Sequence, residues 1–107
     1  MSKRCYAVAK SEQAMKERLE ESDYTNWDFY YPPDEEVLFL LANGGAFNMI
    51  NKACNLLIDE YEEEVIKGEN LLKAATILNS IPGSDRFVFS KALRRAIELG
   101  TAISLGL

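Results

Sequence analysis

The stretch FNMINKACNLLIDEYEEEV, residues 47–65, carries the longest regular hydrophobic pattern in the chain. Its apolar side chains recur at steps of three and four residues: Phe47, Ile50, Cys54, Leu57, Ile58, Tyr61 and Val65. Such spacing places side chains on one face of an α-helix. The stretch therefore predicts one long helix of about six turns, ended by Gly68.

Shorter helices are expected on both sides of this stretch. The segments with helical spacing are residues 12–22, 35–43, 69–81 and 85–107. Residues suited to mark helix ends are Ser11 and Asp34 as N-caps and Gly44 as a left-handed stop. The chain thus predicts a mainly α fold, a compact four- to five-helix domain that spans residues 1–107 as a single unit. Short strands at residues 4–9 and 86–89 remain alternatives.

The composition fits a domain that folds around its own hydrophobic core. The chain has 107 residues, of which 48% are hydrophobic and 27% charged, as in compact globular proteins. Its longest apolar run, residues 37–42, is far too short to cross a bilayer, and the N-terminus lacks the features of a signal peptide. We therefore expect a cytoplasmic protein that does not act at a membrane, with Cys5 and Cys54 as reduced thiols.

No motif of known catalytic chemistry occurs in the chain. There is no histidine, which removes the Ser-His-Asp triad, the Cys-His pair and imidazole metal ligands. The segment NGGAF, residues 43–47, lacks the lysine of a phosphate-binding loop, and no loop with spaced oxygen ligands accompanies the carboxylates. We therefore expect no catalytic residue, no cofactor and no metal site, in a protein that is not an enzyme.

The strongest functional signal is the acidic end of the predicted long helix. In a chain with a net charge of −5, five carboxylates fall within six residues: Asp59, Glu60, Glu62, Glu63 and Glu64. On a helix, like charges four residues apart repel one another, and the helix C-terminus favours cations instead. Because the pattern weakens its own helix, we interpret it as an anionic surface for a basic partner. The alternative is a solvated face neutralised by Lys67, Lys73 or the last helix.

A second candidate surface lies in NWDFYYPPDEE, residues 26–36, where aromatic rings and acids are neighbours. Rings provide desolvated contact area, and carboxylates attract a basic protein. The residues assigned to partner binding here are Asp28, Tyr30, Tyr31, Glu35 and Glu36. Trp27 and Phe29 are expected to pack in the core instead.

The last predicted helix has a basic face formed by Lys91, Arg94 and Arg95. A basic helix after a turn such as NSIPGS, residues 79–84, is also what a DNA-reading helix-turn-helix needs. However, an acidic chain repels phosphate, which disfavours a nucleic-acid partner. We prefer the interpretation that this face pairs with the acidic run.

The stretches WDFYYPPDEE and DEYEEE, on a small, acidic and mostly helical chain without catalytic residues, resemble bacterial immunity proteins. Those proteins bind and neutralise a toxin domain delivered by contact-dependent inhibition or related polymorphic toxin systems, and the toxin is often a nuclease. The resemblance implies a cognate toxin whose basic nucleic-acid-binding site is covered by carboxylates. We therefore expect a protein-binding inhibitor without direct contact to nucleic acid or membrane. A helix-turn-helix-like regulator and a structural adaptor domain are the alternatives.

Overall fold

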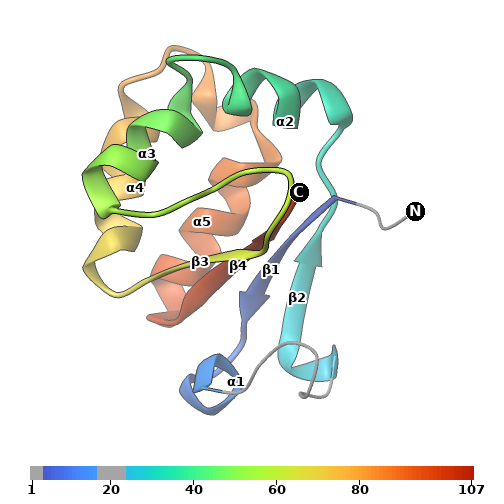
Figure 1. Cartoon of the computed structure of the whole chain (residues 1–107). Coiled ribbons are helices and arrows are strands. Elements are labelled where there is room, and N and C mark those ends of the chain that lie inside the picture. Colours follow the sequence, from blue (N-terminus) through green and yellow to red (C-terminus); the bar gives the residue numbers. More distant parts are fainter. Residues whose placement is uncertain (1–3, 17–23) are drawn as a thin grey trace.

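A four-stranded antiparallel sheet with helices packed against it forms the centre of the protein (Figure 1). The computed structural model describes residues 4–16 and 24–107. The elements in chain order are β1 (Cys5–Ala9), α1 (Glu12–Lys16), a first 3₁₀ turn (Tyr24–Asn26), β2 (Trp27–Tyr30), α2 (Asp34–Leu41), α3 (Ala46–Cys54), β3 (Glu64–Lys67), α4 (Glu69–Asn79), a second 3₁₀ turn (Ser84–Arg86), α5 (Val88–Leu99) and β4 (Ala102–Gly106). The fold is therefore α+β, and the prediction of a mainly α, all-helical domain is wrong.

The strand near the N-terminus is one of the two central strands of the sheet. The spatial order of the strands is β2-β1-β4-β3, and each neighbouring pair is antiparallel. Tyr6 of β1 lies opposite Tyr30 of β2 on one side and opposite Leu105 of β4 on the other. Segments from the two ends of the chain thus pair with each other, a contact that local sequence patterns do not reveal.

The C-terminal segment is a strand, although its spacing predicted a continuing helix. Gly100 adopts the left-handed conformation at φ +66° and ends α5. In β4, Ile103, Ser104 and Leu105 are each at most 2% exposed. A strand buried on both faces lacks the alternation of polar and apolar residues, so its short apolar run cannot be told from a helix by spacing alone. Residues 86–89 contain the end of the second 3₁₀ turn and the start of α5, not a strand.

The predicted long helix over residues 47–65 is also wrong. α3 ends at Cys54, and Asn55 follows in the left-handed region at φ 56° and ψ 49°. A loop then leads to β3, which begins at Glu64 and forms one edge of the sheet. The apolar residues that suggested one continuous stripe are divided between a helix, a loop and a strand.

Several local predictions are confirmed. α2, α4 and the first half of the last predicted helix form where the spacing placed them. The break between α2 and α3 contains Gly44 at φ +77°. Ser11 caps α1, because its Oγ accepts a hydrogen bond from the N–H of Ala14 at 3.1 Å. The rest of the helix predicted there, with Arg18 and Leu19, lies outside the described residues.

The two faces of the sheet are covered by different layers. On one face, large side chains of the strands join the main core with α4 and α5: Tyr6, Val8, Ile66, Ile103 and Leu105. On the other face, Ala7 and Ala9 pack with Trp27 of β2 and Ala14 of α1, and Phe29 is partly buried against this second cluster. Trp27 is 6% exposed, which confirms its predicted place in the core.

A buried carboxylate joins three elements of the main core. Glu36 of α2 is 6% exposed, and its Oε2 accepts a hydrogen bond from the Tyr6 hydroxyl at 3.0 Å. The same carboxylate accepts hydrogen bonds from the backbone N–H groups of Val88 and Phe89 at 2.7 and 3.1 Å. These two residues begin α5, so the negative charge lies at the positive end of the helix dipole. Glu36 therefore fixes β1, α2 and α5 relative to one another.

The Tyr6–Glu36 contact makes the stability of the protein sensitive to alkaline pH. Burial, and then the charge and the hydrogen bond of Glu36, raise the pKa of Tyr6 above its ordinary value. The unfolded chain loses this phenol proton above about pH 10, whereas the folded chain keeps it, so stability falls as pH rises. We expect the free energy of unfolding, measured with urea, to fall with pH above about pH 10, and Tyr6 to contribute about 1.4 kcal/mol per pH unit to that slope. The slope should therefore be smaller in Tyr6→Phe. Equal slopes in the two proteins would contradict the expectation.

Candidate functional site

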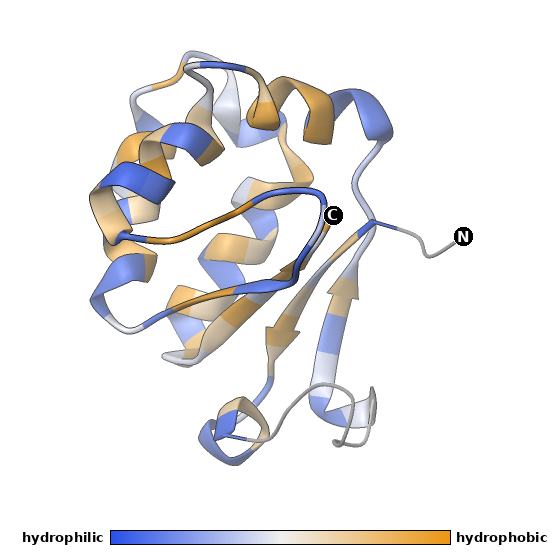
Figure 2. Cartoon of the chain, in the orientation of Figure 1, coloured by the Kyte–Doolittle hydropathy of each residue, from blue (hydrophilic) through white to orange (hydrophobic). Residues whose placement is uncertain are grey.

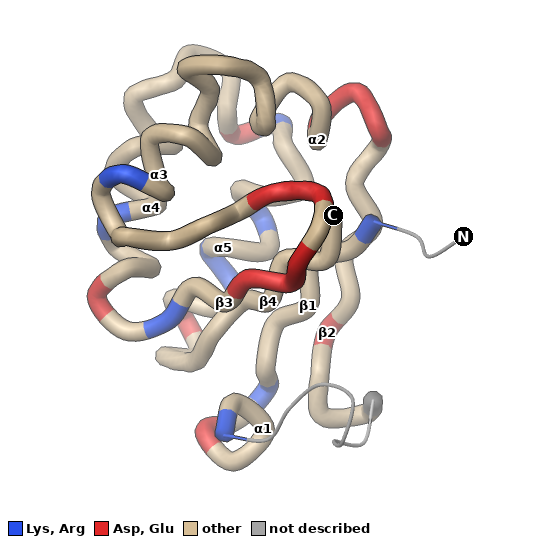
Figure 3. The backbone as a smooth tube through the Cα atoms, in the orientation of Figure 1, with Lys and Arg blue, Asp and Glu red and all other residues tan. Residues whose placement is uncertain are grey.

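The acidic run lies in an irregular loop beside the edge strand, not on a helix. Residues 59–64 are called the acidic loop from here on; residues 59–63 precede β3, and Glu64 is the first residue of that strand. Figure 3 shows this loop in red, close to the C-terminal end of the chain. The predicted repulsion between helical neighbours therefore does not arise, and the expected helix face is replaced by a loop.

Two asparagines end α3 and fix the course of the loop that follows. Asn55 takes a left-handed conformation, which asparagine tolerates better than most residues. The side chain of Asn51 accepts a hydrogen bond from the N–H of Ile58 at 2.7 Å and donates one to its carbonyl at 3.2 Å. Because Ile58 is 4% exposed, this amide holds the apolar anchor of the loop in the core.

Asp59 shapes the start of the acidic loop. Its Oδ1 accepts hydrogen bonds from the N–H groups of Tyr61 and Glu62 at 2.8 and 3.0 Å, a turn in which an aspartate replaces a backbone acceptor. The ring of Tyr61 is left 90% exposed. The carboxylate of Glu62 makes no hydrogen bond or ion pair with any other described residue, so it is directed at solvent.

Two further carboxylates tie the acidic loop to its surroundings. Glu63 Oε1 accepts a hydrogen bond from the hydroxyl of Ser104 in β4 at 2.7 Å. Glu64 accepts hydrogen bonds from the N–H groups of Leu57 and Val65 at 3.0 and 3.1 Å. Three of the five acids of the loop thus accept hydrogen bonds within the protein, which restrains these side chains before any partner binds.

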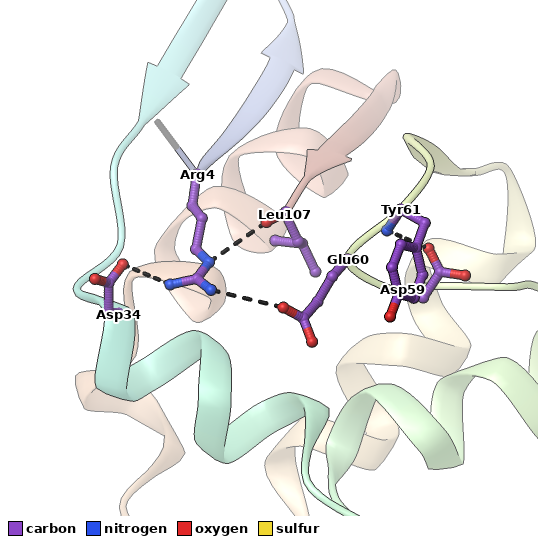
Figure 4. A network of polar contacts seen from close by, with 6 residues as sticks. All are labelled: Arg4, Asp34, Asp59, Glu60, Tyr61 and Leu107. Carbon is purple, nitrogen blue, oxygen red and sulfur yellow. Dashed lines mark hydrogen bonds and ion pairs between the residues drawn. The ribbon is translucent and has the colours of Figure 1, made fainter. Parts of the chain in front are cut away.

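Arg4 connects the acidic loop to the start of α2 (Figure 4). Its guanidinium lies 2.7 Å from Asp34 Oδ1 and 3.8 Å from Glu60 Oε2, and it donates a hydrogen bond to the carbonyl of Leu107 at 3.4 Å. Asp34 was predicted to cap α2, but it is the first helical residue, after Pro33 as the N-cap. Arg4 therefore brings together carboxylates from the two stretches that the sequence suggested as separate surfaces.

Internal cations compensate the acidic loop only weakly. Among the ion pairs of the described residues, the loop takes part in one, the long contact between Glu60 and Arg4. Neither of the two lysines expected to neutralise it forms such a pair within that part of the chain. We define the acidic surface as the acidic loop together with Asp34 and Glu35, which are exposed at the start of α2.

The basic face of α5 is paired with β2 rather than with the acidic loop. Arg95 lies 3.6 Å from one carboxylate oxygen of Asp28, and Lys10 lies 3.7 Å from the other. Asp28 is therefore occupied by internal cations and lies outside the acidic surface. Lys91 and Arg94 are exposed, and α5 packs against both the sheet and α4.

The remaining residues of the second predicted surface do not lie together on one exposed surface. Glu36 is buried under α5 and is not available to a partner. Tyr30 packs partly against the main core, whereas Tyr31 is 60% exposed. Of the residues predicted for this second surface, Glu35 is the one that belongs to the acidic surface.

Two exposed apolar residues of the region were not recognised as site residues. Leu57 is 73% exposed and Tyr61 is 90% exposed, although spacing alone assigned both to a buried helical stripe. Asn51 and Asn55, shortly before the run of acids at residues 59–64, are the signal that could have corrected the prediction of a continuous helix. Asparagine is common where a helix ends, and acids are unfavourable at a helix C-terminus.

The groups of this chain that could bind a metal ion or react as thiols are its carboxylates and its two cysteines. No group of three or more His, Cys, Asp or Glu side chains there is placed to hold a metal ion. Cys5 and Cys54 are free thiols. Burial raises the pKa of both, and the charge of Glu63 adds to the effect at Cys5, so little thiolate forms at neutral pH.

The longest of the described helices, α5, has 12 residues. No described helix has the length and apolar character needed to span a bilayer.

Comparison with known proteins does not assign the chain to a family. No protein-family model, no curated protein and no solved structure matches it. The class of protein is therefore defined by the structure itself: a small α+β domain with an antiparallel sheet of order β2-β1-β4-β3 and an acidic surface beside its edge strand.

Proposed function

We propose that this chain is a protein-binding inhibitor, an immunity protein that neutralises a cognate basic toxin by covering the toxin's active site with the acidic surface. The observation that carries the proposal is the acidic loop: of its five carboxylates, Glu60 alone forms an ion pair within the described chain, and that contact, with Arg4, is long at 3.8 Å. A nuclease fits such a surface best, because its active site attracts the phosphates of nucleic acid, and the carboxylates of the acidic surface can occupy the positions of those phosphates.

The order and composition of the acidic loop support binding to a basic protein. Uncompensated carboxylates attract a cationic surface and speed up association, an effect that salt weakens. An exposed tyrosine such as Tyr61 is a residue type that often supplies binding energy at the centre of an interface. Because Asp59, Glu63 and Glu64 already form internal hydrogen bonds, little of their conformational freedom remains to be lost on binding.

Glu62→Lys tests the proposal, since the Glu62 carboxylate supports no contact within the described structure. The partner to be used is the purified toxin domain encoded directly upstream of this chain. We expect Glu62→Lys to weaken binding about tenfold at low salt, mainly through slower association, with a smaller difference at high salt. Association rates measured at several salt concentrations, together with inhibition of the toxin's activity, give the readout.

Glu98→Lys is the matched control for charge. It makes the same substitution on α5, at an exposed side chain outside the acidic surface, and should leave the association rate unchanged. If Glu62→Lys and Glu98→Lys both bind like the wild type, the acidic surface is not the binding site. If no toxin domain is encoded upstream, or if the chain does not inhibit it, the immunity role itself is rejected.

A further inference from the structure

Two large apolar side chains of α2 are more than half exposed next to the acidic surface. Leu38 is 55% exposed and Phe39 is 56% exposed, whereas Val37 and Leu40 on the other side of the helix are fully buried. Figure 2 shows α2 as mainly hydrophobic after its hydrophilic first turn. α2 therefore has apolar side chains on two sides. The protein buries one side; on the other, the ring of Phe87 contacts that of Phe39, with the centroids 5.8 Å apart, and leaves it more than half exposed.

The exposed apolar pair is continuous with the acidic surface. Leu38 follows Asp34 by four residues and Phe39 follows Glu35 by four, so each lies one turn from a carboxylate on the same helix face. Asp34 in turn contacts Arg4 at 2.7 Å, and the same guanidinium reaches the acidic loop. Apolar and acidic groups thus lie next to each other on one surface, and protein interfaces combine both kinds of group.

We infer that the exposed face of α2 is the apolar centre of the partner site and that it receives a basic amphipathic helix of the partner protein. The inference rests on the proposed function and adds the chemistry of the partner to it. Leu38 and Phe39 lie on a helix, so their ridge can pack into the grooves of a second helix. Lysine or arginine residues along that second helix then meet the carboxylates of Asp34, Glu35 and the acidic loop.

A synthetic helix tests this chemistry without the toxin. The probe is a peptide of about fourteen leucines and lysines arranged at helical spacing, and its twin carries glutamate in place of lysine. The wild-type chain should bind the lysine peptide, but not the glutamate twin, in a calorimetric titration. Leu38→Ser should weaken binding about tenfold or more. Because Leu38 is largely exposed, the variant should keep the Tm of the wild type.

Leu72→Ser is the matched control, since Leu72 of α4 is 60% exposed and undergoes the same substitution away from α2. It should bind the lysine peptide like the wild type. Equal affinities of Leu38→Ser and Leu72→Ser for the peptide would overturn the inference. A wild-type chain that forms dimers, with a monomeric Leu38→Ser variant, would also overturn it and assign the face to a second copy of the chain.

The toxin experiment separates this inference from the proposed function. If Leu38→Ser inhibits the toxin as well as the wild type does, while Glu62→Lys does not, the role of α2 is wrong and the immunity role stands. If binding of the lysine peptide depends on Leu38 but no toxin is inhibited, the preference for a basic helix stands and the immunity role fails.

Discussion

Glu36→Ala is expected to lower the free energy of unfolding by about 3–5 kcal/mol. The substitution removes the acceptor of three donors at once: the Tyr6 hydroxyl and the N–H groups of Val88 and Phe89. A buried donor without a partner costs about 1–3 kcal/mol, and the negative charge at the start of α5 is lost as well. Since a domain of this size has a net stability of about 5–15 kcal/mol, the variant should be close to unfolding.

Urea unfolding at neutral pH measures the effect of Glu36→Ala. Glu36→Gln should lose less stability, because its amide oxygen still accepts a hydrogen bond while its amide nitrogen does not. Glu35→Ala is the control: Glu35 is exposed, and its loss should change stability by less than about 0.5 kcal/mol. If Glu36→Ala is as stable as Glu35→Ala, burial of the charge costs as much as its hydrogen bonds contribute.

Asn51→Ala is expected to lower the free energy of unfolding by about 2–4 kcal/mol and to release the acidic loop. The side chain of Asn51 satisfies both the N–H and the carbonyl of Ile58, and alanine can satisfy neither. Ile58 is the buried anchor of the segment between α3 and β3. With both backbone groups unpaired, the loop should leave its place more often, and the ordered acidic surface should be lost with it.

Hydrogen exchange at the Ile58 amide gives the most direct measurement for Asn51→Ala, because that amide donates to the replaced side chain. Its exchange should become faster, together with that of the acidic loop, and urea unfolding should show the loss of stability. Asn55→Gly is the control: glycine adopts the left-handed conformation of Asn55 freely, so exchange at Ile58 should not change. Unchanged exchange in Asn51→Ala would show that the core holds Ile58 without the amide.

Local signals in the sequence were sufficient where a residue's own conformational preference decides the structure. Gly44 and the serine cap at Ser11 were placed correctly, because left-handed geometry and capping depend on neighbouring residues alone. Charge counting likewise identified the acidic run at residues 59–64 as a candidate site. Its local arrangement was mistaken, since the helical spacing over residues 47–65 outweighed the two asparagines that end α3.

The sequence by itself determined the acidic character, the absence of histidine chemistry and the approximate positions of α2, α4 and α5. Only the tertiary structure decided that the two ends of the chain are neighbouring strands, because Tyr6 and Leu105 meet through pairing that no local window contains. It also separated Glu35 from Glu36, two adjacent glutamates of which one is exposed and one is buried. Burial and pairing depend on what lies opposite a residue in space, so neighbours in sequence with the same chemistry can take opposite roles.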